Sequence, residues 1–222
     1  MGRAGPIEAY FVALFGTFGY ELNRYVLTTI GNDFGYSSQI FLYGGTAALF
    51  AGLFLSCKEK ETTQLHFLNT GSSITGTISI FGAILIWIFL PLLVLDPELK
   101  FIRTHPSALT IIPISIYYSV SASIISSIAF SIFFNNKMLI RNIILAIVGG
   151  GIASSSASYY ILNPVYSLII GFTSGLIQAI ICLIEKKKSR SKVISTFSFA
   201  TFVFHGFAGC VWDSIFRAAV SG

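Results

Sequence analysis

Long apolar runs follow one another along almost the whole chain, and this pattern restricts the possible folds more than any other feature. Most runs hold about 20 apolar residues, the length that an α-helix needs to cross roughly 30 Å of hydrocarbon. We therefore predict seven membrane-spanning helices in one transmembrane domain that covers residues 1–222. The predicted ranges are 7–30, 37–56, 74–95, 108–134, 138–161, 166–184 and 193–220.

The composition supports an all-α, polytopic membrane helix bundle. Hydrophobic residues make up 54% of the chain and charged residues only 10%, too few to cover a soluble domain of this size. The short alternating segments of a membrane β-barrel are absent from the sequence. The three cysteines stand singly, without metal-ligand spacing. We find no nucleophile elbow, phosphate loop or carboxylate pair, so we expect no enzymatic activity, no cofactor and no metal.

The basic residues of the loops predict the orientation. With seven spans, ten Lys and Arg residues fall on the side of the N-terminus, and only Lys100 and Arg103 fall on the other side. This bias places the N-terminus inside and the C-terminus outside. The net charge of +5 is thus an orientation signal and does not indicate a nucleic-acid partner. The densest basic run is interpreted either as a topology anchor or as a contact with anionic membrane lipid: Lys186, Lys187, Lys188, Arg190 and Lys192.

Small residues recur within the predicted spans, where they allow helix backbones to approach closely. We interpret them as helix-packing positions and expect Gly150→Leu to destabilise the bundle. The glycines concerned are Gly149, Gly150, Gly151, Gly171, Gly175, Gly206 and Gly209.

Two pairs of charged residues lie inside predicted spans. Glu21 and Arg24 are three apart, and Asp213 and Arg217 are four apart, so each pair shares one helix face. The pairs, or one cluster of all four, are interpreted as self-neutralising contacts that fix helix register. The alternative is a polar vestibule or a proton path. His205 is likewise either a hydrogen-bond donor between helices or a functional group of a pathway.

Several stretches, taken in order, resemble the ammonium transporter/Rhesus (Amt/Rh) family. VFHGFAGCVW is similar to the family's His-Gly-x-x-Gly pore helix, and FGAILIWIFLP to its Leu-Trp helix that ends in proline. ILAIVGGGIASSSASYYILNPVYSLIIGFTSG resembles its Gly-Gly helix, the following proline and the next helix. GPIEAYF, ELNRYVL and SSQIFLYGGTAALFAGLFL are similar to its fourth and fifth spans. The resemblance implies an inverted repeat around a narrow pore, usually in trimers, of which this chain would hold spans four to ten.

The departures from the family pattern affect the pore itself. The resemblance matches His205 to the second histidine of the family's pore pair, but the first aligns with Phe41, which cannot share or relay a proton. The family's acidic residue on the fourth span aligns with Arg24, and one gating phenylalanine aligns with Leu85. We therefore predict a vestigial pore at His205, Phe41 and Leu85, with Phe41 facing a neutral His205 and plugging the path.

Two hypotheses follow for the function. In the first, the chain is a shortened, non-transporting Amt/Rh-derived protein, a structural or accessory subunit whose Gly- and Ser-rich faces need other membrane-protein subunits as partners. A respiratory-type complex of the inner mitochondrial membrane is one hypothesis for the host. In the second, the chain is a channel for ammonia or another neutral gas, completed by oligomerisation or by a second chain.

Overall fold

The fold is entirely helical in the part of the chain that can be described. A computed structural model describes residues 6–30, 35–58, 73–95, 107–135, 140–161, 163–188 and 194–221, and no strand occurs within these ranges. The sequence-based prediction of an all-α membrane helix bundle is confirmed. The long helices are α1 (Pro6–Ile30), α2 (Tyr43–Lys58), α4 (Ser73–Leu95), α6 (Ala108–Asn135), α7 (Ile140–Ser155), α8 (Ser167–Lys188) and α9 (Ile194–Ser221).

Three of the described helices are long and apolar enough to cross a membrane. They correspond to Gly76–Leu95 in α4, Ala108–Phe133 in α6, and Pro164–Ile184, which is mainly α8. The apolar part of α7, Asn142–Ser155, is shorter. Pro91 lies inside α4 and Pro113 inside α6, which membrane helices tolerate when neighbouring groups satisfy the freed backbone carbonyls.

Two predicted ranges contain irregular turns. The range 37–56 begins as a π-helix, η1 (Ser37–Leu42), which follows Tyr36 in the left-handed conformation at φ 59°. The range 138–161 ends as α-helix at Ser155 and continues into a 3₁₀ turn, η3 (Ala157–Tyr159). Ser154, Ser155 and Ser158 bond to carbonyls three or four residues before them, and this competition with the backbone favours the end of a helix. A second 3₁₀ turn, η4 (Pro164–Tyr166), precedes α8.

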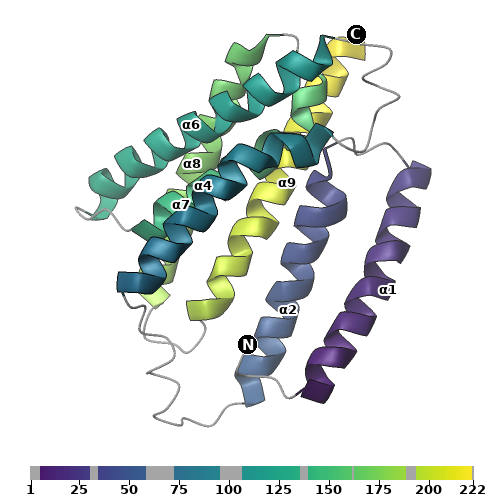
Figure 1. The fold of residues 1–222 in the computed structure, drawn as a ribbon, viewed down its shortest axis with the longest axis vertical. Coiled ribbons are helices and arrows are strands. Elements are labelled where there is room, and N and C mark those ends of the chain that lie inside the picture. Colours follow the sequence, from purple (N-terminus) through teal and green to yellow (C-terminus); the bar gives the residue numbers. More distant parts are fainter. Residues whose placement is uncertain are drawn as a thin grey trace.

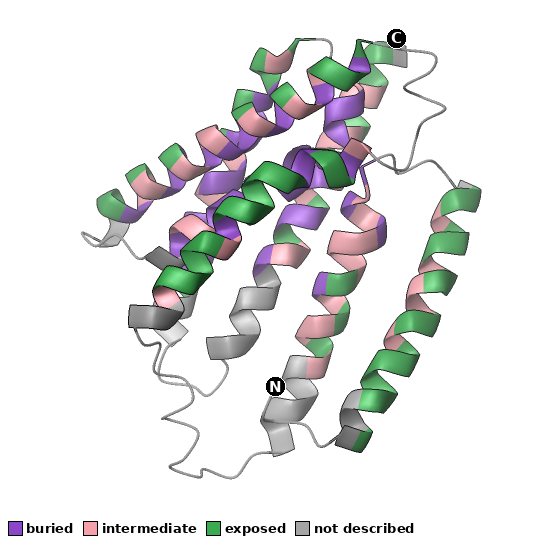
Figure 2. Ribbon diagram, viewed as in Figure 1, coloured by how far each residue is buried: buried purple, intermediate pink, exposed green. Residues whose placement is uncertain are grey.

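The helices form a bundle with α1 at one edge (Figure 1). The most extensive contact joins α6 and α8, and α7 packs against both. α2 packs against α9, and α1 meets the rest of the chain chiefly through α2 and η1. Burial is concentrated in α6, α7 and α8, whereas most of α1 and one side of α4 are exposed (Figure 2).

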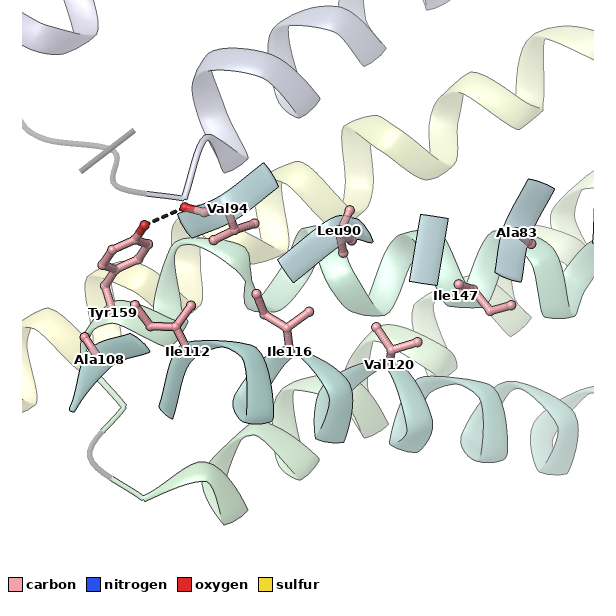
Figure 3. Close-up of a cluster of buried hydrophobic side chains, with 9 residues drawn as sticks. All are labelled: Ala83, Leu90, Val94, Ala108, Ile112, Ile116, Val120, Ile147 and Tyr159. Atoms are coloured by element: carbon pink, nitrogen blue, oxygen red, sulfur yellow. Dashed lines mark hydrogen bonds between the residues drawn. The ribbon is translucent and has the colours of Figure 1, made fainter. Parts of the chain in front are cut away.

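A hydrophobic cluster holds α4 onto α6 and α7 (Figure 3). Tyr159 at its edge donates a hydrogen bond of 2.5 Å to the carbonyl oxygen of Val94. Since α4 ends at Leu95, this carbonyl is one of the four that a helix terminus leaves without an intrahelical partner. The buried members of the cluster are Ala83, Leu90, Val94, Ala108, Ile112, Ile116, Val120, Ile147 and Tyr159.

Serines of α6 pack against glycines and carbonyls of α7 and α8. Ser119 donates to the Gly150 carbonyl at 2.9 Å, and Ser123 donates to the Ala146 carbonyl at 2.9 Å. A Cβ added at Gly171 would overlap the carbonyl oxygen of Ser119. The expectation that Gly- and Ser-rich faces lie open to outside partners is therefore wrong for these helices, because their small residues allow the chain to pack against itself.

Candidate functional site

His205 lies on α9 with no exposed surface. Its Nδ1 is 2.7 Å from the carbonyl oxygen of Thr201, one turn earlier in the same helix. Its Nε2 is 3.1 Å from the carbonyl oxygen of Ser174 in α8. Both carbonyl oxygens only accept hydrogen bonds. The ring nitrogen that carries the proton therefore donates a hydrogen bond to a backbone carbonyl.

The ring of His205 fits beside Gly149 of α7. A Cβ added at Gly149 would lie 2.5 Å from both Cδ2 and Nε2 of the imidazole, closer than real side-chain contacts allow. The glycine therefore makes room for the histidine. Contact with Gly149 of α7, the approach of Nε2 to the Ser174 carbonyl of α8 and attachment to α9 bring three helices together at one side chain.

Polar side chains extend this buried contact. Thr201 donates from Oγ1 to Oε1 of Gln178 on α8 at 3.2 Å, and Ser123 of α6 lies 3.5 Å, Oγ to Oγ, from Ser174. Ser123, Ser174, Gln178 and Thr201 are all at most 1% exposed. Among the described residues, no group of three or more His, Cys, Asp or Glu is placed to hold a metal. The nitrogens of His205 lie beside backbone carbonyls, and the arrangement links helices.

The other two predicted pore residues have different surroundings. Phe41, in η1, is half-buried and packs against the α4–α6–α7 hydrophobic cluster. Leu85 is 42% exposed on α4. His205 is directed toward Gly149 and Ser174, and the face-to-face arrangement of Phe41 and His205 stays a prediction.

The π-helix that carries Phe41 is fixed to α7 and α9. Ser37 lies 2.7 Å, Oγ to Oγ, from Ser155, and its hydroxyl donates to the Ile152 carbonyl at 3.1 Å. Gly206 lies against the backbone of Leu42, where an added Cβ would be 2.8 Å from the amide nitrogen. Gly209 similarly faces Ser37. The glycines that follow His205 thus permit the close approach of η1 to α9.

The predicted charge pairs form, and their environments differ. Asp213 accepts a hydrogen bond of 3.1 Å from Nη2 of Arg217, and the guanidinium carbon lies 5.2 Å from the centre of the Tyr160 ring. Glu21 and Arg24 are 3.9 Å apart, and their side chains are 60% and 57% exposed. A single cluster of all four charged residues stays a prediction.

The remaining predicted sites concern packing and the basic run. Gly150 faces Ser123, Gly151 faces Leu90, and Gly175 faces Ser126. α8 extends to Lys188, but the side chains of Lys186, Lys187 and Lys188 lie outside the described residues, as do Arg190 and Lys192 entirely.

Sequence reasoning missed the serines of α6, which recur every three or four residues from Ser115 to Ser131, a spacing that indicates one helix face. It also missed Gln178 and Thr201, polar residues inside apolar runs that have no motif to mark them.

A model of the Ammonium Transporter Family matches residues 6–220. The chain belongs to this family. It is 23% identical over 184 residues to an ammonium transporter Rh type C of Xenopus tropicalis. The aligned region covers 81% of this chain and 38% of the relative. It is 24% identical over 184 residues to an ammonium transporter Rh type B of Rattus norvegicus, with 81% of this chain and 39% of the relative covered.

The Amt/Rh-family chain thus spans less than two fifths of the length of these curated relatives. No solved structure matches it. The family match and the apolar helices establish an integral membrane protein of a transporter family, which is not an enzyme family. The resemblance predicted from the sequence motifs is confirmed.

Proposed function

We propose that this Amt/Rh-family chain does not conduct ammonium and acts as a structural or accessory subunit of a larger membrane assembly. The environment of His205 carries the proposal. The ring is fully buried, both nitrogens are within hydrogen-bond distance of backbone carbonyls, and Gly149 closes one side. A histidine that relays protons or guides ammonia must present a nitrogen to the permeant molecule, whereas the nitrogens of this histidine lie beside backbone carbonyls of α8 and α9.

The competing function is a channel for ammonia or another neutral gas, completed by oligomerisation or by a second chain. Membership in a family whose similar members are named ammonium transporters favours it. The two functions differ in one measurable quantity, which is the flux of ammonia that depends on this protein.

The flux is measured in proteoliposomes that contain a trapped pH-sensitive dye. We expect mixing with ammonium chloride to raise the internal pH at the rate of protein-free liposomes, because both ring nitrogens of His205 lie beside backbone carbonyls. The Rh type B protein of Rattus norvegicus, reconstituted at the same density, is the positive control. Faster entry that disappears in His205→Ala would overturn the structural role and establish the channel.

Restoring the first histidine of the family's pore pair gives a further test. The variant Phe41→His should also show no flux above protein-free liposomes, because the Nε2 of His205 remains 3.1 Å from the Ser174 carbonyl and the family's acidic residue on the fourth span aligns with Arg24. Ammonia entry that appears in this variant would show that a path exists and that Phe41 alone closes it.

We propose an orientation with the N-terminus inside and the C-terminus outside, on the basis of the loop charges. A tag at Gly222 should be cleaved by protease added outside sealed vesicles, while a tag at Met1 should be cut only after detergent is added. The reverse pattern would contradict the orientation. We also propose that the basic residues Lys186–Lys192 contact anionic lipid headgroups on the inner side.

A further inference from the structure

Serine hydroxyls of α6 bond to the backbone of α7 in a regular register. Ser119 donates to the Gly150 carbonyl at 2.9 Å. One turn later, Ser123 donates to the Ala146 carbonyl, also at 2.9 Å. Four residues forward along α6 therefore correspond to four residues back along α7, as expected of antiparallel helices whose facing residues recur every three or four positions.

At the next turn, this register places Ser127 of α6 opposite Asn142 of α7. Ser127 is 1% exposed and Asn142 is 2% exposed. Within the described part of the chain, neither Oγ of Ser127 nor Oδ1 of Asn142 has a hydrogen-bond partner. Buried polar atoms are nearly always bonded, either to protein or to ordered water. Two unbonded atoms on facing residues therefore indicate a shared partner.

The side chains of α7 explain why Ser127 does not repeat the bonds of the other serines. Gly150 and Ala146 carry at most a methyl group, so α6 approaches the α7 backbone closely enough for direct bonds. Asn142 is larger, and its amide lies between the helices, where Nδ2 is 3.4 Å from Oγ of Ser131 on α6. A side chain of this size keeps the two backbones further apart at this turn.

The amide of Asn142 also contacts α8. Its Nδ2 is 3.0 Å from Sγ of Cys182 and 3.4 Å from Oγ of Ser131. Both N–H groups are thus used, and the oxygen Oδ1 is the part of the amide that lacks a bond. Ser131 lies four residues beyond Ser127 on the same face of α6, about 6 Å along the axis. The gap between the amide and Ser127 is therefore one that a single small molecule can bridge.

We infer that one ordered water molecule is bound between α6 and α7, where it accepts a hydrogen bond from Ser127 Oγ and donates one to Asn142 Oδ1. Since Oδ1 only accepts and the hydroxyl can donate, the bound molecule must carry both an acceptor and a donor. Water does so, and internal waters bond about two to four buried polar groups. Bulk water is near, because Ser127 lies about 9 Å before Phe133, where the apolar span of α6 ends.

Ions and apolar molecules fit these two atoms less well. A cation would lack a counter-charge, because α6, residues 142–155 of α7 and residues 167–184 of α8 contain no Asp or Glu. An anion has no donor for Oδ1 of Asn142, and an apolar molecule would leave both atoms unbonded. The site shares no residue with the contacts of His205, so it is independent of whether the chain conducts ammonia.

An experimental structure at a resolution that shows ordered water tests the inference directly. We expect a density peak at hydrogen-bond distance from both Ser127 Oγ and the amide of Asn142. A direct hydrogen bond between these two side chains would overturn the inference. So would a map that shows other internal waters but no peak between these two.

Serine-to-alanine variants test the bond itself. Ser127→Ala should lower the melting temperature in mild detergent by about 2–4 °C, because the bound water loses a partner. The matched control is Ser115→Ala. Ser115 is also fully buried on α6, and its Oγ has no partner among the described residues. The register places it opposite Ser154, whose hydroxyl already bonds the Gly150 carbonyl. This control should keep or raise the melting temperature, and an equal change in both variants would overturn the inference.

The background of Asn142→Leu shows whether the two residues act together. This substitution removes the second partner of the water, so adding Ser127→Ala to it should lower the melting temperature no further. If Ser127→Ala causes its full decrease in this background, Ser127 acts without Asn142 and no water bridges them. If Asn142→Leu does not fold, the density between the wild-type side chains decides the question.

Discussion

Substituting leucine for Gly171 should prevent the bundle from forming a stable unit. An added Cβ would overlap the carbonyl oxygen of Ser119, and the carbonyl carbon and Cα of Ser119 would both be 2.8 Å away. All three are backbone atoms, so the contact is relieved only if α6 and α8 move apart along their most extensive interface. Overpacking costs about 1–3 kcal/mol where side chains yield, and we expect more here. The melting temperature in mild detergent measures the loss.

Two further glycines calibrate the result. Gly150→Leu should also destabilise the bundle, because its Cβ would lie 2.6 Å from Cβ of Ser123. Gly82→Leu is the matched control, since nothing lies within 4 Å of the Cβ position at Gly82 on α4. Gly82→Leu should have the melting temperature of the wild type. If Gly171→Leu and Gly150→Leu have that melting temperature too, the α6–α7–α8 packing described above is wrong.

The helices of this fold were predictable because their cause is local. Twenty apolar residues in a row have one favourable arrangement in a membrane, and a helix occupies each of the seven predicted ranges. The irregular turns were not predictable in the same way. The π-helix at Ser37 depends on hydrogen bonds to Ile152, Ser155 and Ser156, more than 110 residues away.

The site was predictable only in part. The ionisable residues stand out in apolar runs, so His205 and both charge pairs were found from the sequence. The partners of His205 were not, because they are backbone carbonyls, which every residue carries. The serines of α6 were hidden for another reason. A serine can bond within its own helix, and only the glycines opposite show that this face meets other helices.

The same reasoning predicts that substitutions at Gly149 and His205 are coupled. Gly149→Ala alone should destabilise the bundle by about 1–3 kcal/mol, because the new Cβ would be 2.5 Å from the imidazole. His205→Ala alone should cost about 2 kcal/mol or more, since it leaves a buried cavity and removes the hydrogen bond that the imidazole N–H donates to one of two backbone carbonyls. In the double variant the methyl group introduced at position 149 enters the space that the ring has left. The combined loss of unfolding free energy should therefore be smaller than the sum, by about 1–2 kcal/mol.

Unfolding in detergent mixtures of increasing denaturing strength measures this cycle. The change from glycine to alanine also raises intrinsic helix propensity, so Gly82→Ala, alone and with His205→Ala, is the control for that effect. The losses of unfolding free energy from two distant substitutions add within about 0.5 kcal/mol. The losses from Gly82→Ala and His205→Ala should therefore add in this way. If the losses of unfolding free energy from Gly149→Ala and His205→Ala add equally well, the ring does not face Gly149. An imidazole directed elsewhere would be free to line a path, and the channel would then explain His205 better than a link between helices does.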